Sequence, residues 1–193
     1  VDNLLWAKPI LERFDIPATI FVTTGYVEDQ RPFWWDELEY YLLNVESDKK
    51  QELALNISGH VYRWQLSNVS QRQQAYHDLM KILTGVDANE VESVLKQMRG
   101  CRTMSDYLVE NDYRAFTINE LQELSTCDLI EIGAHTRNHV NLAVLSPSAQ
   151  FEEIQGCRHD LETWLERECT SFSYPFGFPN LHFDNESVEI VRK

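Results

Sequence analysis

Two histidines spaced four residues apart are the first candidates for chemistry in this sequence. His135 and His139 follow a short apolar stretch, residues 129–132, that predicts a strand. Neutral imidazole is a common ligand for zinc-like metals, and parallel α/β folds place their sites at the carboxyl ends of strands. If the segment turns helical there, both imidazoles project from one face. The spacing therefore indicates a metal site, although such pairs are more often structural. Thr136, where a catalytic Glu would stand, excludes the metalloprotease motif.

A second candidate is the turn expected after a third predicted strand at residues 171–174. Pro175 fixes its own φ and Gly177 permits an unusual φ, so the backbone around Phe176 should make a defined turn with exposed amide groups. Such amides can stabilise the oxyanion of a tetrahedral intermediate. Taken alone, the pattern is more typical of an ordinary strand-exit turn lined with aromatic side chains.

The elements that would position both candidates alternate between helix and strand. An apolar stripe at residues 4–14 predicts a helix, and a β-branched and aromatic run at 18–23 predicts a strand buried on both faces. Thr117 opens a capping box for another helix, and Ser146 with Pro147 starts a long one. This alternation implies an α/β fold with parallel strands and outer helices, as an open doubly wound sheet or a barrel.

Residues 34–115 have a different character and are expected to form a mostly helical insertion. An alternating pattern at 53–66 predicts a β-hairpin. Ser70 can cap one of the helices that follow, and Asp87 with Glu90 forms a plausible capping box for the next.

The composition of the chain argues against several classes of function. The chain has 193 residues and a net charge of -14, from 17 basic and 31 acidic side chains. An acidic surface repels phosphate backbones, so nucleic acid is not an expected partner. No run approaches the ~18 apolar residues of a membrane span, so none is expected in this chain. The four cysteines form no Cys-x-x-Cys pair, which argues against a zinc knuckle, and a chain of this length needs no disulfide framework.

Taken together, these features resemble the polysaccharide deacetylase family, metal-dependent carbohydrate esterases that remove N- or O-acetyl groups from sugars. Residues 9–22 look like the segment that follows the family's first motif. His135 and His139 match its His-Ser/Thr-x-x-His motif, and residues 174–177 match the Pro-Tyr-Gly turn of its third motif. The resemblance covers residues 1–33 and 116–193, and the insertion resembles that of some bacterial members.

The resemblance implies a fold, a cofactor and a set of site residues. The fold is an irregular (β/α) barrel, here an incomplete one, with residues 1–193 as a single partial domain. The cofactor is a divalent metal, zinc first and cobalt or nickel as alternatives, with His135 and His139 as two of its three protein ligands and Thr136 supporting their loop by hydrogen bonding. The residues implied in the turn are Phe176, whose backbone N–H holds the oxyanion, and Tyr174, Pro175 and Gly177, which set the geometry.

The sequence departs from the family pattern in three places. The family's paired Asp residues, a general base and the third metal ligand, would lie before Val1, and Asp2 is not assigned their role. Ser173 stands where an Arg often orients the base. The later motifs, with the His that protonates the leaving amine, would lie beyond Lys193, and His182 is expected to be a loop residue.

We therefore expect the chain to be part of a longer bacterial hydrolase that removes acetyl groups, foremost N-acetyl groups, from a polysaccharide. The chain by itself should be inactive or nearly so, and it should hold the metal weakly or not at all, because catalytic zinc normally has three protein ligands. Unpaired strand edges should favour self-association. The sequence does not indicate the polysaccharide or the compartment.

Two alternatives remain open at this point. One is a catalytically dead family member that binds a glycan or a protein. The other is an unrelated α/β interaction domain that docks a protein through aromatic residues of the insertion, Trp34, Trp35, Tyr40, Tyr41 and Trp64, although aromatic residues at helical spacing are usually core. Glu131 has no assigned orientation, and the acidic pair at residues 152–153 is expected on a solvated helix face.

Overall fold

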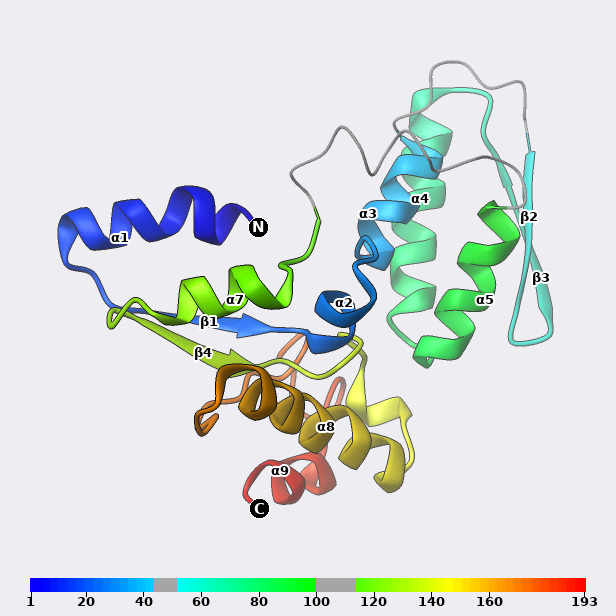
Figure 1. The fold of residues 1–193 in the computed structure, drawn as a ribbon. Helices are drawn as coiled ribbons and strands as arrows, with labels where there is room; N and C mark the ends of the chain where they lie inside the picture. The colour runs from blue at the N-terminus through cyan, green and yellow to red at the C-terminus, as the bar shows by residue number, and fades with distance from the viewer. Residues whose placement is uncertain (44–51, 100–113) are drawn as a thin grey trace. The chain divides into compact units, whose positions relative to one another are not determined.

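The computed structural model describes residues 1–43, 52–99 and 114–193, and the chain divides into two compact units (Figure 1). The first unit comprises Val1–Arg31 and Asp112–Lys193, and the second comprises Pro32–Asn111. The second unit overlaps residues 34–115, whose status as an insertion in a family domain stays a prediction.

The first unit contains a short parallel sheet. Strand β1 (Ala18–Val22) pairs in parallel with β4 (Ile130–Ala134), in a register that places Val22 beside Ala134. An isolated parallel bridge continues the sheet from Ala134 to Phe172. The N–H of Ala134 donates to the carbonyl of Ser171 at 2.9 Å, and the N–H of Ser173 donates to the carbonyl of Ala134 at 3.0 Å. The carboxyl ends of three parallel segments therefore meet at one edge.

Helices pack against this sheet, and local capping explains where several of them begin. The described helices of this unit are η1 (Asn3–Ala7), α1 (Lys8–Phe14), α2 (Thr24–Asp29), α7 (Ile118–Ser125), η2 (Leu142–Val144), α8 (Pro147–Leu165) and α9 (Asn185–Val191). Thr117 and Glu120 form a reciprocal capping box at α7, and Ser146 caps α8 ahead of Pro147. Figure 1 shows α8 alongside β4, with α9 next to it.

The core of this unit lies on one face of the sheet. Its buried members include Val22 and Ile132 from the strands, Leu121 from α7 and Leu161 from α8. Burying each such side chain contributes ~1.5–3 kcal/mol. The opposite face of β1 is not covered by these helices, and Phe21 is 40% exposed there. The expectation that β1 is buried on both faces is therefore wrong, because α7 and α8 pack on a single side.

The mixed α/β class is confirmed, but the strand pairing does not show a barrel. Within residues 1–43, 52–99 and 114–193, the first unit pairs β1 with β4 and adds the bridge at Phe172. No helix in these ranges is long and apolar enough to cross a membrane. Cys127, Cys157 and Cys169 are buried free thiols, and Cys101 lies outside the described residues.

The second unit has helices and a β-hairpin. Its described elements are α3 (Trp34–Leu42), β2 (Glu52–Ile57), β3 (His60–Gln65), α4 (Val69–Leu83) and α5 (Ala88–Arg99). Ser58 and Gly59 join the strands with φ angles of 50° and 81°, as a tight two-residue turn requires. The cap predicted at Ser70 is wrong, because the side chain of Asn68 accepts from the N–H of Gln71 instead.

Two of the aromatic residues considered for docking a protein contribute to the core of this second unit. Trp34 is 3% exposed and Tyr41 is 7% exposed. Trp35, Tyr40 and Trp64 are half-buried, and the indole N–H of Trp64 donates to a carboxylate oxygen of Asp78 at 3.1 Å. This burial favours a structural role for these rings over a docking surface.

A buried ion pair links α3 and α5 in the second unit. The carboxylate of Glu37 is 1% exposed and accepts from Nε and a terminal nitrogen of Arg99, at 2.6 and 2.8 Å. Arg99 also bonds Glu92 at 2.7 Å. A buried carboxylate needs such a partner, because desolvation penalises its charge.

Replacing Arg99 by alanine should leave the Glu37 charge buried and unpaired. We expect a loss of about 2–3 kcal/mol in the free energy of unfolding, which is less than the ~3–5 kcal/mol of a fully buried pair because Arg99 is 34% exposed. Urea denaturation of the variant measures this loss. The control is Lys96→Ala, which removes an exposed cation 3.8 Å from Glu92 and should cost less than ~0.5 kcal/mol. Equal losses in the two variants would contradict the assignment.

Candidate functional site

His135 directly follows β4 and is hydrogen-bonded to both neighbouring segments of the sheet. Its main-chain N–H donates to the carbonyl of Val22 at 3.1 Å, and its ring Nδ1 lies 2.7 Å from the carbonyl oxygen of Ser173. A carbonyl oxygen can only accept, so Nδ1 carries the proton in this hydrogen bond. The ring's Nε2 therefore presents a lone pair, which is the arrangement that metal-ligating histidines use.

The segment from His135 to His139 is a loop and not a helix. Thr136 and His139 have positive φ angles of 65° and 52°, so the helical arrangement considered from the spacing is wrong. The hydroxyl oxygen of Thr136, which is fully buried, accepts from the N–H of His139 at 3.0 Å. The loop still brings the imidazoles together, with ring centroids 4.8 Å apart and ring planes at 72°.

Burial sets the charge state of both imidazoles. Desolvation lowers the pKa of His135, and the hydrogen bond to Ser173 offsets part of that effect. The pKa of His139 is lowered to about 4, first by burial and then by the nearby His135. Both rings are therefore neutral near pH 7, and neutral imidazole is the form that coordinates a metal.

Two of the three residues between the histidines, Arg137 and Asn138, are bonded to a carboxylate of α8. Glu153 accepts from the main-chain N–H groups of Arg137 and Asn138, both at 2.9 Å, and from the side-chain amide of Asn138 at 2.7 Å. The other end of that amide accepts from Arg31 at 2.7 Å. The expectation that Glu153 lies on a solvated face is therefore wrong, because the loop folds back onto α8.

A second carboxylate of α8 binds the side chain of Arg137. Asp160 accepts from the guanidinium at 2.9 and 2.7 Å, and also from the hydroxyl of Thr24 at 2.8 Å. On the other side of the loop, the N–H of Gly25 donates to the carbonyl of Arg137 at 2.9 Å. The histidine loop is thus fixed by α2 and α8 together.

Sequence reasoning missed these supporting residues, although a signal existed. Glu153, Gly156 and Asp160 are spaced by three and four residues and so lie on one stripe of α8. A Cβ on Gly156 would lie 2.9 Å from Nε of Arg137, so the glycine makes room for the guanidinium between the carboxylates. Two acidic residues on one face of a helix, with a glycine between them, form the pattern that could have predicted a basic side chain packed against that face.

The turn after the third strand lies against the histidine pair. Pro175 is buried, and the N–H of Gly177 donates to its carbonyl at 2.8 Å, which makes a three-residue γ-turn centred on Phe176. Phe176 and Gly177 have φ angles of 62° and 73°. The ring of Phe176 meets the ring of His139 edge-on, with centroids 5.0 Å apart. In the described part of the chain, no backbone carbonyl accepts from the N–H of Phe176.

Three further aromatic contacts lie around this turn. The ring of Tyr174 stacks on Phe183 with centroids 4.0 Å apart. The loop residue His182 lies near the turn, with its ring 5.1 Å from that of Phe176 and 5.5 Å from that of Phe178. These contacts extend a series of rings outward from His139.

The donor set fits part of a zinc site. Two neutral imidazoles lie together, and His135 has a hydrogen bond that orients its ring, as zinc ligands commonly do. Across residues 1–43, 52–99 and 114–193, no group of three or more His, Cys, Asp or Glu side chains gathers around a common point. Glu131 lies on the exposed face of β4 and accepts from Thr19 at 3.2 Å, so it does not join the pair.

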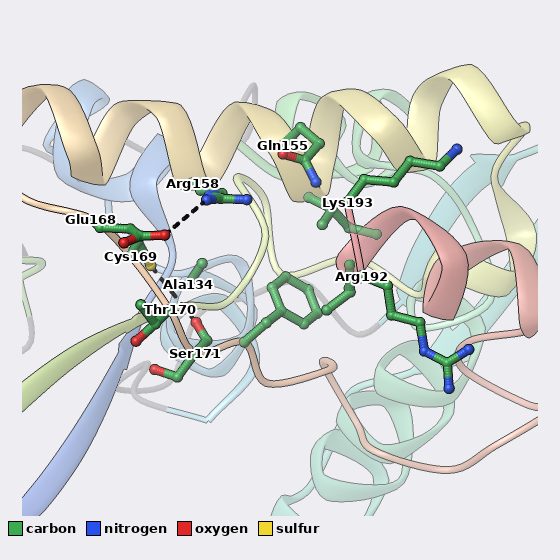
Figure 2. Close-up of a pocket in the computed structure, with 12 residues that line it drawn as sticks. Ala134, Gln155, Arg158, Glu168, Cys169, Thr170, Ser171, Arg192 and Lys193 are labelled. Atoms are coloured by element: carbon green, nitrogen blue, oxygen red, sulfur yellow. Dashed lines mark hydrogen bonds and ion pairs between the residues drawn. The ribbon is translucent and has the colours of Figure 1, made fainter.

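A cavity of about 330 Å³ lies between α8, α9 and the segment at residues 168–172 (Figure 2). Its cationic lining residues include Arg158, which pairs with Glu162 at 2.9 Å and Glu168 at 3.7 Å, and Arg192, which pairs with Glu189 at 2.8 Å. The lining contains neither histidine of the pair and no residue of the γ-turn. This cavity is therefore separate from the candidate site.

Three comparisons with known proteins were informative to different degrees, and the match to a family model shows the family. The family model described as "Polysaccharide deacetylase" matches residues 6–193. A comparison with curated proteins gives no match. Among solved structures, the Streptococcus pyogenes deacetylase PplD in complex with acetate is similar at 14% sequence identity, over 94% of this chain and 73% of that chain, with a TM-score of 0.37.

Replacing Gly25 by alanine should displace the histidine loop. The added Cβ would lie 2.7 Å from the carbonyl oxygen of Arg137, which is a backbone atom and cannot swing aside. We expect a loss of about 1–3 kcal/mol in the free energy of unfolding, and shifted ring-proton NMR signals for His135 and His139.

The matched control for Gly25 is Gly85→Ala. Its Cβ would have its nearest contact, the carbonyl of Ile82, at 3.4 Å, which is ordinary van der Waals contact. This variant should stay within ~1 kcal/mol of the parent sequence and leave the histidine signals in place. Unshifted histidine signals in the Gly25 variant would show that this close approach does not fix the loop.

Proposed function

The chain belongs to the polysaccharide deacetylase family, and from that membership we propose that its parent protein hydrolyses acetyl groups, foremost N-acetyl groups, from a polysaccharide with the help of a bound divalent metal. One observation carries this proposal at the site. His135 and His139 lie side by side at the strand ends, and the hydrogen bond from His135 to Ser173 leaves the Nε2 lone pair of His135 available. An acetylated carbohydrate is the substrate class that the family implies.

His135 and His139 are the residues that would hold the metal, with zinc proposed first and cobalt or nickel as alternatives. A divalent ion bound there would polarise the acetyl carbonyl and activate a water molecule. Thr136 keeps the second imidazole in place through its hydrogen bond to the N–H of His139. The low pKa values of both rings mean that no proton has to leave before the ligands bind.

The γ-turn would supply the electrostatic stabilisation of the developing oxyanion. We propose that the N–H of Phe176 donates to the acetyl oxygen as negative charge builds on it. Tyr174, Pro175 and Gly177 hold this N–H in place, through the stack on Phe183, the fixed proline φ and the hydrogen bond across the turn. A positive φ at a residue other than glycine is strained, and such strain persists where the surroundings enforce it, often at functional sites.

We also propose that the three parallel segments belong to an incomplete (β/α) barrel, and that this chain by itself is inactive or nearly so. The described residues contribute two imidazoles to the site and no third ligand beside them. Catalytic zinc normally has three protein ligands, so we expect another ligand, as well as a general base, to come from outside the described residues.

A second candidate is a catalytically dead family member that binds a glycan or a protein. Ser173 favours it, because a serine cannot replace the guanidinium that orients the base in many family members. The main-chain carbonyl of Ser173 nevertheless accepts the hydrogen bond that orients His135, and this bond does not involve the Ser173 side chain. The two candidates share the histidine pair and differ in whether acetate is released.

Metal binding tests the histidine pair. We expect the chain to bind Zn²⁺ weakly in calorimetric titration, and His135→Ala or His139→Ala to remove most of that binding. The control is His159→Ala, which changes an exposed histidine on α8 and should leave the affinity unchanged. Binding that survives in both site variants would place the metal elsewhere.

Acetate release tests the reaction itself. We expect no measurable acetate from an N-acetylated oligosaccharide with this chain and Zn²⁺, because the described residues place no third ligand beside the two imidazoles. A longer protein that supplies a third ligand and a base should release acetate, and His139→Ala in that protein should abolish the release. Robust acetate release by the present chain would falsify its proposed inactivity, and glycan binding by the longer protein without release would favour the second candidate.

A further inference from the structure

Glu153 bonds Arg137 and Asn138, which lie between the two histidines in the loop. Its carboxylate oxygen Oε2 accepts from the N–H groups of Arg137 and Asn138, and Oε1 accepts from the side-chain amide of Asn138. The three donor–acceptor distances are 2.9, 2.9 and 2.7 Å. Hydrogen bonds to a charged acceptor are roughly twice as strong as neutral ones.

We propose that Glu153 is a positioning residue that keeps the imidazoles of His135 and His139 turned toward a common metal ion. This inference rests on the proposed function, because it assigns Glu153 a role toward the metal that the pair would hold. Glu153 touches neither imidazole in any hydrogen bond of the described chain. It acts through the backbone of Arg137 and Asn138, two of the three residues that separate them.

The strain in the loop explains why such a residue is needed. Thr136 and His139 both adopt positive φ angles, which are unfavourable for residues with a Cβ, and most of all for β-branched threonine. A conformation of this kind persists only where the surroundings enforce it. Without Glu153, two main-chain N–H groups and one side-chain amide lose their acceptor, and the loop is free to relax toward more favourable angles.

The position of α8 does not depend on Glu153. Ile154, Cys157 and Leu161 bury the apolar face of this helix, at 2%, 0% and 1% exposure. Asp160 separately binds the side chain of Arg137. Removing the carboxylate of Glu153 should therefore leave the helix docked and change the loop above it.

The first test measures Zn²⁺ affinity by calorimetric titration of the full chain. We expect Glu153→Ala to weaken binding by about tenfold to a hundredfold, the usual effect of losing a residue that orients metal ligands. Glu153→Gln keeps one carbonyl oxygen for the two main-chain N–H groups, so its loss should be smaller. Glu152→Ala is the matched control, because it removes the neighbouring, exposed carboxylate and should change the affinity by less than about twofold.

A second measurement needs no metal and separates positioning from general destabilisation. Amide hydrogen exchange at His139 reports on the bond to Thr136, which Glu153 does not make itself. We expect much faster exchange there in Glu153→Ala than in Ile154→Val, a core substitution on α8 that lowers stability without touching the loop. Equal exchange at His139 in these two variants would show a merely structural role.

The two measurements distinguish failure of this inference from failure of the proposed function. If the unaltered chain binds no Zn²⁺, the two-histidine metal site fails as a feature of this chain, and the exchange at His139 alone decides whether Glu153 holds the loop. If the chain binds Zn²⁺ and Glu153→Ala binds it within twofold of the unaltered chain, the positioning role is overturned. Weaker binding together with faster exchange at His139 supports it.

Discussion

His135 is hydrogen-bonded to the segments on both sides of β4, and the geometry of the site follows from this. Its main chain donates to Val22, and its ring donates to the carbonyl of Ser173. These bonds are possible because the carboxyl ends of parallel strands meet at one edge of the sheet. The same bonds settle the ring's tautomer and place the γ-turn at Phe176 beside His139.

The loop between the histidines shows how an acidic chain can build a site with two neutral imidazoles. The carboxylates of Glu153 and Asp160 are occupied by backbone amides and by the guanidinium of Arg137. They hold the loop in a strained conformation, and their bonds to those donors offset their charge. Burial then keeps both imidazoles unprotonated. The position of the imidazoles and their protonation state therefore have separate causes. The carboxylates of α8 bond the loop that carries the imidazoles, and desolvation lowers the imidazole pKa values.

Local sequence signals predicted where helices begin better than they predicted which faces of a strand are buried. The capping box at Thr117 and the cap and proline at the start of α8 stand where the sequence indicated, because such bonds involve residues a few positions apart. Ser70 failed as a cap because Asn68, two residues earlier, offers an equally suitable side chain. The burial of β1 was mispredicted because an apolar run shows what a strand could bury and not which faces the helices cover.

The sequence by itself determined the family, the mixed α/β class and the side chains available for chemistry, since these depend on residue types and short spacings. Tertiary structure decided how those side chains are used. The tautomer of His135 and the bonds of Glu153 depend on partners at least 15 residues away, and the positive φ angles of the loop persist because its surroundings enforce them. No spacing along the chain specifies such contacts, because they form only when α2, α8 and the strand ends pack together.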